Sequence, residues 1–486
     1  MAKPKTETKE KLAGRVFTPA HLVEFMLDLA TYVPDDSILG RHVADNSCGE
    51  GAFLEPVVRR YAEAYRKKSG DKKGLRKDLE KFVHGIELDA ETHANCLRRL
   101  DGVADELGLG KVQWDVRCGD ALTEAAFDGR MDWVVGNPPY VRVHNLGFSA
   151  MDVKRQVFSQ GGMTDLYLSF YELGFRMLAP KGRLCYVTPS SWFNSLAGTN
   201  MRAWILGKRN LAELFDLGHY QPFEATAYVA VALFEDGKRH DTVRFGTYGE
   251  DHTGTFVDDI PLDEAWFGDS FRFARRDRLR WLRELSTMVV PRAVVAKNGF
   301  ATLADDVFVA DSFPFGDWII PTVKASTGKW RKAFYPYDKL GKPLPKKTVF
   351  SNRRVSEWLE ERKGRLLKGK PESAVPDWHL YGRTQALADV WKDKWAVNSV
   401  VRNADSLKLT HAPAGSGVYG GLYILGNVPA DRLLAALSGD DFYEYVALLQ
   451  KYKSGGYYTF NTKELTRFLN WKLASFPDSG DTFRLI

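Results

Sequence analysis

Hydrophobic residues in the first half of the chain follow two alternating patterns. Short apolar runs, typical of buried strands, are separated by stretches in which apolar residues recur every three or four positions, as on one face of a helix. Residues 20–33 form the first helical stretch. Strands and helices are then expected in turn at 42–46, 51–68, 83–88, 90–108, 112–118, 131–136, 164–178, 184–188, 200–209, 212–217 and 227–235. This order predicts a doubly wound, mostly parallel α/β sheet with helices on both faces.

Several segments interrupt or end this series. Residues 66–81 carry many charges and are expected to form a solvated insertion. Residues 141–162 form a long loop, and because such loops in compact domains are usually functional, we expect this one to lie over the active site. The final strand, 227–234, is expected to pair with 211–217 as a hairpin, and 248–254 reads as a loop.

The second half of the chain is basic. Residues 290–486 contain 29 Lys and Arg against 20 Asp and Glu, and residues 324–370 contain 15 against 4. Aromatic residues are interleaved with these charges, a combination that suits a polyanion with bases to contact. A solvated basic face without a partner is the alternative. Helices are expected at 272–285, 353–367 and 430–450.

Size and composition set the broad class of the protein. The 486 residues suffice for two domains, 44% of them are apolar, and no stretch approaches the roughly 20 apolar residues of a membrane span. Residues 1–7 are charged and lack the apolar region of a signal peptide. The four cysteines have no Cys-x-x-Cys spacing, which argues against a disulfide framework or a metal site. We therefore expect a cytoplasmic protein that does not contact a membrane.

The strongest functional signal is Asn137-Pro138-Pro139-Tyr140, directly after the apolar run 131–136. Two prolines fix two φ angles and remove two backbone donors, so the carbonyls there are left to accept from another group. The amide oxygen of Asn137, a proline carbonyl and the ring of Tyr140 then lie close together. This arrangement suits a planar group that carries an NH2, such as a nucleobase. The alternative is an ordinary turn with a packing tyrosine.

Three earlier strands each end in an acidic residue. Asp45 precedes a turn with Gly49 and Gly51, and these glycines let the backbone approach a ligand closely. An acidic turn disfavours a pyrophosphate and favours a cofactor with a cationic or amino-acid end, such as S-adenosylmethionine. Glu87 can accept from both hydroxyls of a ribose, and Asp120 from an adenine amine. Each acid alone is more often a helix N-cap, but three in order before the Asn-Pro-Pro-Tyr segment favour a ligand.

Together these motifs resemble the gamma-ordered adenine-N6 DNA methyltransferases of type II restriction–modification systems. In that group a Phe-Thr-Pro segment comes first, then the glycine-rich turn, then Asn-Pro-Pro-Tyr, and a DNA-recognition domain last. Val16-Phe17-Thr18-Pro19 stands at the expected place. The family's Asp-Pro-Ala-x-Gly-x-Gly is here Asp-Asn-Ser-Cys-Gly-Glu-Gly at 45–51, with the acid and glycines retained. Beyond residue 250, only the order of domains and the Ser-Gly-Gly-Tyr-Tyr segment at 454–458 support the resemblance.

The resemblance also implies an assignment of domains and site residues. It implies a basic tail at 1–14, a Rossmann-like S-adenosylmethionine-dependent methyltransferase domain at 15–255, and a mixed α/β target-recognition domain at 256–486. The implied cofactor site consists of Thr18, Asp45, Gly49, Gly51, Phe53, Glu87 and Asp120. The implied catalytic site consists of Asn137, Pro138, Pro139, Tyr140 and Phe223. Asp165 is expected either to line the pocket or to cap a helix.

The implied reaction transfers a methyl group to N6 of an adenine that is flipped out of duplex DNA. Asn137 Oδ1 and the Pro138 carbonyl accept the two N6 hydrogens, and Tyr140 stacks on the base. Phe223 covers its other face, with Tyr220 as the runner-up. Neither a metal nor a side-chain nucleophile is needed, since positioning and electrostatics govern the transfer. The expected partner is double-stranded DNA. A separately encoded restriction endonuclease that acts on the same site is a candidate second partner, and a solitary methylase is the alternative.

Other functions stay open at this point. Enzymes that methylate a glutamine amide in a protein, or a guanine in ribosomal RNA, also use Asn-Pro-Pro-Tyr, but they usually lack a long basic C-terminal domain. A DNA-binding protein with a relic catalytic domain is the third hypothesis, and the intact Asn137, Tyr140, Glu87 and Asp120 argue against it. A cytosine-N4 enzyme more often has serine in place of Asn137.

Overall fold

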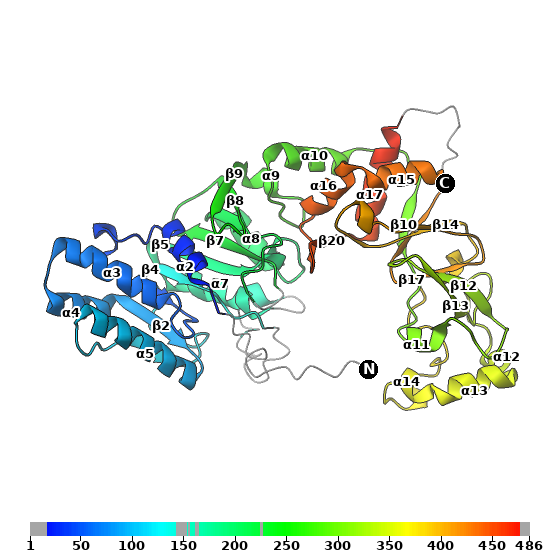
Figure 1. Ribbon diagram of the computed structural model, residues 1–486, viewed down its shortest axis with the longest axis horizontal. Helices are drawn as coiled ribbons and strands as arrows, with labels where there is room; N and C mark the ends of the chain where they lie inside the picture. The colour runs from blue at the N-terminus through cyan, green and yellow to red at the C-terminus, as the bar shows by residue number, and fades with distance from the viewer. Residues whose placement is uncertain (1–16, 142–152, 154–155, 161–164, 224–226, 477–486) are drawn as a thin grey trace. The chain divides into compact units, whose positions relative to one another are not determined.

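The computed structural model describes residues 17–141, 153, 156–160, 165–223 and 227–476. Contacts divide the chain into two units, Met1–Arg280 and Trp281–Ile486, drawn from blue to green and from green to red in Figure 1. The division falls inside helix α10 (Arg276–Thr287), later than the expected boundary at 255. The expected tail at 1–14 and most of the expected loop at 141–162 lie outside the described residues.

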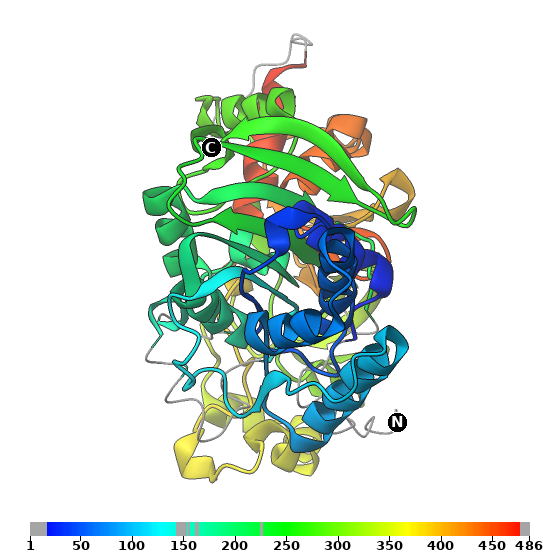
Figure 2. The same cartoon turned by 90° about the vertical axis from the view of Figure 1, so that its left-hand side faces the viewer.

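The first unit is built on one large sheet. Its strands are β1 (Val43–Asp45), β2 (Val83–Glu87), β3 (Asp115–Cys118), β4 (Met131–Gly136), β5 (Leu178–Pro189), β6 (Leu211–Asp216), β7 (Val229–Glu235), β8 (Thr242–Tyr248) and β9 (Gly254–Pro261). They form a nine-stranded sheet in the order β3-β2-β1-β4-β5-β7-β6-β8-β9. In Figure 2 the blue helices of this unit lie in front of the sheet. Strands β1 to β5 pair in parallel, whereas β7 is antiparallel to β5 and β6. The predicted antiparallel pairing of 211–217 with 227–234 is thereby confirmed.

Helices cover both faces of this sheet, because successive residues of a strand point to opposite faces. Trp133 and Val135 enter one hydrophobic core, and Val134 between them enters the other. Helices α2 (Ala20–Leu29), α3 (Leu54–Lys68), α4 (Lys72–Phe82) and α5 (Ala90–Leu107) contribute to the first core; α7 (Leu166–Met177), α8 (Thr199–Lys208) and α9 (Leu262–Ala265) contribute to the second. Short 3-10 turns occur at Asp36–Ile38, Val157–Ser159 and Ser190–Phe193. The unit therefore has the doubly wound fold that the sequence predicts.

The expectation of a solvated insertion at 66–81 is wrong. Helix α3 continues to Lys68, and the Asp71 side chain caps α4 by accepting from the backbone of Lys73. Leu75, Leu79 and Phe82 recur at helical spacing and are buried in the first core. The charges that suggested a loop occupy the outer face of this amphipathic helix.

The sheet also continues beyond 227–234, so the expectation that this is its last strand is wrong. Strand β8 pairs in parallel with β6, and β9 pairs with β8 as an antiparallel hairpin. Val243, Phe245 and Ile260 bury their side chains in the second core. Because β9 crosses position 255, the first unit extends past the expected domain boundary.

The second unit contains three small sheets. Its strands are β10 (Val295–Asn298), β11 (Val309–Ala310), β12 (Ile319–Lys324), β13 (Lys329–Phe334), β14 (Lys394–Val397), β15 (Val400–Val401), β16 (Leu409–Ala412), β17 (Gly417–Tyr419), β18 (Leu422–Leu425), β19 (Tyr452–Lys453) and β20 (Tyr457–Thr459). The strand orders are β10-β18-β14-β16, β11-β13-β12-β17 and β15-β20-β19. The Ser-Gly-Gly-Tyr-Tyr segment forms the turn between β19 and β20 and the first two residues of β20, and Gly455 and Gly456 in the turn have φ of +79° and +77°.

Helices fill the rest of the second unit. They are α11 (Asp305–Phe308), α12 (Lys346–Ser351), α13 (Arg353–Glu361), α14 (Lys363–Leu367), α15 (Ala430–Ser438), α16 (Asp440–Leu448) and α17 (Thr462–Ala474), with 3-10 turns at Glu372–Ala374, Leu387–Asp389 and Ala404–Ser406. The expected helix at 430–450 is two helices, separated at Gly439. The helices expected at 272–285 and 353–367 correspond to α10 and to α13 with α14.

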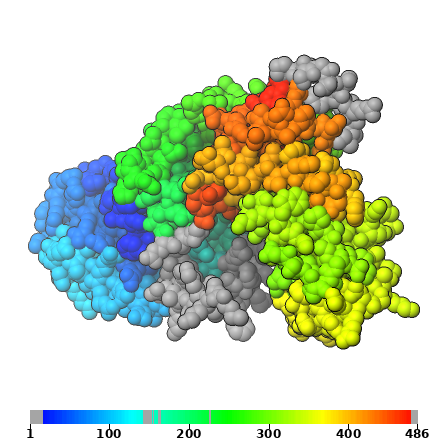
Figure 3. All heavy atoms as spheres, turned by 45° about the vertical axis from the view of Figure 1, so that its right-hand side comes forward, coloured from blue at the N-terminus to red at the C-terminus, as the bar shows by residue number. Residues whose placement is uncertain are grey.

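Aromatic residues between 324 and 370 mostly belong to the core of the second unit. Phe334 is fully buried and Tyr335 and Tyr337 are 2% and 6% exposed, whereas Trp330 is 44% exposed. Several cations there have acidic partners, such as Arg353 with Glu357. The yellow segment with α12 to α14 occupies one end of this unit (Figure 3). The aromatic residues in this pattern therefore belong largely to the folded core. The pattern does not by itself identify a surface that contacts bases.

Candidate active site

The predicted site residues converge at the carboxyl ends of strands β1 to β4. Asp45 ends β1, Glu87 ends β2, Asp120 follows β3 and Asn137 follows β4. These strands are parallel, so their carboxyl ends share one edge of the sheet. The strand order reverses between β1 and β4. In open α/β sheets such a reversal leaves a crevice in which ligands bind.

The glycine-rich turn after β1 is tied to the end of β2. Gly49 and Gly51 have φ of +55° and +85°, a region that other residues rarely adopt. The backbone N–H of Gly49 donates to Glu87 Oε2 at 3.1 Å, and that of Asp89 donates to Oε1 at 2.8 Å. A carboxylate accepts about four hydrogen bonds. Glu87 therefore orients the turn and still has lone pairs for a ligand.

Asp45 is a buried carboxylate at the centre of this edge. It is 1% exposed, and its Oδ1 accepts from the backbone of Ser47 at 3.0 Å. Burial raises the pKa of Asp45 to about 7; the hydrogen bond from Ser47 opposes this rise, and the charge of Glu87 adds to it. Within the described parts of the chain, no basic side chain forms an ion pair with Asp45, Glu87 or Asp120. A cationic group of a ligand would therefore favour the charged form of Asp45.

Asn137 is held by a residue more than a hundred positions earlier. Its Nδ2 donates to Oγ1 of Thr18 at 3.0 Å, which fixes the orientation of the amide, and Thr18 itself is 4% exposed. The Ser47 hydroxyl donates to the backbone carbonyl of Asn137 at 3.4 Å. A Cβ on Gly136 would lie 2.7 Å from Asp45 Oδ1, so only glycine fits there. The Phe-Thr-Pro segment, the glycine-rich turn and Asn-Pro-Pro-Tyr thus meet at one point.

Ser47 and Gly136 are two site residues that the sequence analysis missed. Gly136 had a signal, because it is the last residue of a strand that runs directly into Asn137. Ser47 had none beyond its place in the glycine-rich turn, since its contact with Asn137 depends on the pairing of β1 with β4.

Two aromatic rings lie at the catalytic segment. The rings of Tyr140 and Phe223 are 6.2 Å apart with an interplanar angle of 68°, and the Tyr140 hydroxyl donates to the carbonyl of Val187 at 3.2 Å. Tyr220 instead contacts the rings of Tyr248 and His252. Of the two residues considered for the far face of a base, Phe223 is therefore the one beside Tyr140.

The remaining predicted residues also have structural roles. Asp120 accepts from the backbone of Leu122 at 2.9 Å, as in an Asx turn. Phe53 is 2% exposed and packs in the first core at the start of α3. Asp165 lies at the N-cap position of α7, where its side chain makes no capping hydrogen bond. The assignment of these three residues to a ligand stays a prediction.

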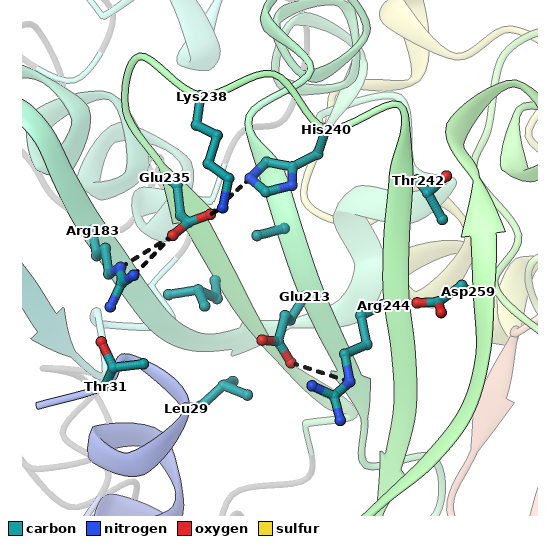
Figure 4. A pocket seen from close by; sticks show the side chains of 12 residues that line it. Leu29, Thr31, Arg183, Glu213, Glu235, Lys238, His240, Thr242, Arg244 and Asp259 are labelled. Atoms are coloured by element: carbon teal, nitrogen blue, oxygen red, sulfur yellow. Dashed lines mark hydrogen bonds and ion pairs between the residues drawn. The ribbon is translucent and has the colours of Figure 1, made fainter. Parts of the chain in front are cut away.

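A separate hollow of about 660 Å³ lies at the opposite edge of the same sheet (Figure 4). In its wall, Glu235 accepts from Arg183 at 3.1 Å and from Lys238 at 2.9 Å, and His240 Nε2 lies 2.8 Å from Glu235 Oε2. These charges satisfy one another, and the lining includes none of the predicted site residues.

The described residues contain neither a candidate metal site nor a candidate membrane span. No group of three or more His, Cys, Asp and Glu side chains there could hold a metal ion. No helix in the same part of the chain has both the length and the apolar character that crossing a membrane requires.

Part of the chain is similar to modification enzymes of known sequence. Residues 60–223 match the family model described as Eco57I restriction-modification methylase. The type II methyltransferase M.BstVI of Geobacillus stearothermophilus is 27% identical over 260 residues, which cover 50% of this chain and 46% of that protein. The type II methyltransferase M.XhoI of Xanthomonas vasicola is 31% identical over 242 residues, covering 48% and 44%. The chain thus spans less than half the length of these relatives.

Solved structures share the fold over most of the chain. The type IIL restriction-modification enzyme MmeI in complex with DNA aligns with a TM-score of 0.59 and 12% identity, covering 91% of this chain and 63% of that one. Together with the relatives, this likeness confirms the mixed α/β methyltransferase fold. The fold and the relatives also imply S-adenosylmethionine as cofactor. The acidic, glycine-lined edge at Asp45 and Glu87 fits a molecule with a cationic amino-acid end and a ribose.

Proposed function

We propose that the chain is a site-specific DNA methyltransferase, which transfers a methyl group from S-adenosylmethionine to N6 of an adenine flipped out of duplex DNA. It protects host DNA in a restriction–modification system, beside a separately encoded endonuclease that cuts the same site. The basic second unit recognises the target sequence. The matched family and relatives support this proposal. The observation that carries it is the Asn137 amide, oriented by Thr18 beside the acidic edge.

In this proposal the cofactor lies along the carboxyl ends of β1 to β3. Glu87 accepts from its ribose hydroxyls and Asp120 from its adenine amine, while Asp45 faces its cationic amino-acid end. When bound, the cofactor supplies an electrophilic methyl group. The protein contributes position and electrostatics, and no nucleophilic side chain is required.

The target base binds on the other side of Asn137. Its exocyclic amine donates to Asn137 Oδ1 and to the carbonyl of Pro138, which orients the nitrogen lone pair and raises its nucleophilicity. Tyr140 stacks on one face of the base and Phe223 covers the other. Because the two rings now meet nearly edge to face, they must turn parallel and separate to admit a base between them.

The test is single-molecule sequencing of DNA from cells that express the protein, beside cells that express Asn137→Ala. We expect N6-methyladenine within one short motif in the first sample and none in the second. Methylcytosine at N4 in that motif would overturn the choice of base. Unmodified DNA, from a protein that still binds S-adenosylmethionine in solution, would move the substrate to a protein glutamine or an RNA guanine.

A finer test concerns the hydrogen bond that orients Asn137. Thr18→Val keeps the shape of the side chain but removes the acceptor for Asn137 Nδ2, whereas Thr18→Ser keeps a hydroxyl. We expect a roughly tenfold lower single-turnover rate for the valine variant, since a hydrogen bond contributes about 1 kcal/mol or somewhat more. The serine variant should stay close to the wild type. Equal rates for all three proteins would remove Thr18 from the mechanism.

A further inference from the structure

Three segments meet around a pair of stacked histidines near the catalytic residues. His21, in the first turn of α2, lies parallel to His252 with ring centroids 3.7 Å apart and planes within 6°. Its Nδ1 is 2.8 Å from the hydroxyl of Tyr248, the last residue of β8. Tyr220 lies 6.1 Å from the His252 ring. Neither cofactor binding nor the receptor for the target amine accounts for this cluster.

The turn that carries His252 is exposed and has a left-handed backbone at that residue. His252 has φ of +59°, in the left-handed region where histidine, like asparagine and aspartate, is enriched among residues other than glycine. Asp251 holds the turn by accepting from both the backbone and the hydroxyl of Thr253. At the start of β9, a Cβ on Gly254 would lie 2.3 Å from the Phe25 ring. The start of β9 therefore packs directly against α2.

The two neighbours of His252 each lie three positions from a residue of the proposed mechanism. His21 follows Thr18, whose hydroxyl orients Asn137. Tyr220 precedes Phe223, which faces Tyr140. The His252 ring is thus the shared contact between the segment that orients the amide and the loop that carries the second aromatic residue.

We propose that His252 is a positioning residue for methyl transfer: stacked on His21 and adjacent to Tyr220, it keeps the Thr18 segment and the Phe223 loop in register. This inference rests on the proposed function. The β8–β9 hairpin then contributes to catalysis, although it comes later in the sequence than the strands that form the cofactor site. The His252 ring acts through Thr18 and Phe223. Loss of this ring should therefore slow the reaction without weakening cofactor binding.

The stack also depends on pH. Two imidazoles at this separation repel each other strongly if both are protonated, and burial followed by the proximity of His252 lowers the pKa of His21 from its ordinary value of 6.5. The other titratable groups near the pair are Tyr248, Tyr220 and Asp251, with Glu250 beside Tyr220. Because the folded form binds protons less readily than a free imidazole, the stack is stable above about pH 6.5 and weakens as the pH falls below it.

Two substitutions at His252 separate the positioning role of its ring from the effect of its protonation. His252→Asn suits the left-handed backbone but has no ring, and His252→Phe keeps a ring that does not titrate. At pH 8 we expect the asparagine variant to lose about three- to tenfold in single-turnover rate, with unchanged affinity for S-adenosylmethionine and unchanged or higher melting temperature. The phenylalanine variant should restore the rate. It should also retain more of its pH 8 activity at pH 5.5 than the wild type does.

The outcomes distinguish this inference from the proposed function. A wild type that methylates DNA, with both variants matching its rate at every pH, would overturn the role of His252 alone. A rate loss that only follows a loss of melting temperature would do the same. A wild type that methylates no DNA would overturn the proposed function and this inference with it.

Discussion

The nine-stranded sheet has acidic residues at two opposite edges, one at the carboxyl ends of β1 to β4 and one at the hollow around Glu235. The hydrogen-bonding partners of these acidic residues differ. At the carboxyl edge, Asp45 and Glu87 accept from backbone N–H groups of the glycine-rich turn and its neighbours, and no basic side chain pairs with either within the described residues. At the other edge, Glu235 is paired with the cationic side chains of Arg183 and Lys238, and the His240 ring lies beside it. The carboxylates at the first edge can accept further hydrogen bonds from a ligand, whereas the carboxylate of Glu235 is already paired within the chain.

This difference separates a ligand site from a structural ion-pair cluster. A buried carboxylate without a cation raises the free energy of the folded chain, and the cost is recovered only when a ligand arrives. A carboxylate that its own chain has already paired gives a ligand little to gain. The hollow at the second edge is therefore not the proposed active site, although it is open and polar (Figure 4).

The largest expected effect is on stability at Asp45. With a pKa of about 7 in the folded protein against 3.8 ordinarily, ionised Asp45 destabilises the fold by roughly 4 kcal/mol at pH 8. The folded chain binds more protons than the unfolded chain between these values, so stability from this group falls as the pH rises through that window. Asp45→Asn should therefore raise the free energy of unfolding at pH 8, and raise it less at pH 5, in urea titrations.

The same variant should lose cofactor affinity. The asparagine no longer attracts a cationic amino-acid end, so we expect about tenfold weaker binding of S-adenosylmethionine in calorimetric titrations. Lower stability of Asp45→Asn at pH 8 would contradict the account of this edge. Unchanged affinity would remove Asp45 from the cofactor site.

The next prediction compares the effects on cofactor affinity of replacing a glutamate at each of the two edges. Glu87→Gln replaces one carboxylate oxygen by an NH2 group that cannot accept from a ribose hydroxyl. We expect the dissociation constant for S-adenosylmethionine to rise about 10- to 100-fold. Glu235→Gln is the matched control at the opposite edge and should leave it unchanged. Equal losses in both variants would mean that general destabilisation, and not the ribose contact, explains the result.

The smallest effect concerns the stability contributed by Glu235. Burial raises the pKa of Glu235, but the hydrogen bond from Lys238 and the charges of Arg183, Lys238 and His240 outweigh it, so its pKa lies below 4.5. Its contribution is present above the ordinary carboxyl pKa and lost as the pH falls through the lower folded value. Glu235→Gln should cost about 1 kcal/mol of unfolding free energy at pH 7, and the difference from the wild type should shrink toward pH 3. Methylation should not change.

Local sequence patterns predicted most strands and helices of the first unit, but some of the predictions made from them were wrong. The strand-end acids and Asn137 were found because a parallel sheet brings the carboxyl ends of its strands to one edge, whatever their separation in sequence. Helix α4 was missed because its charges outnumber the stripe of Leu75, Leu79 and Phe82. The aromatic residues of the basic segment suggested a surface suited to nucleobases, but Phe334 and its neighbours are buried, since a small domain needs them for its core.

The sequence by itself determined the alternation of strands and helices, the order of the motifs and the chemistry of the acidic edge, because each depends on residues close together in the chain. Only the tertiary structure decided which distant residues touch: Thr18 with Asn137, Ser47 with the Asn137 carbonyl, and the β8–β9 turn with α2. These contacts depend on strand order and register across the sheet. Hydrophobic periodicity specifies which face of an element is buried, but not which element lies beside it.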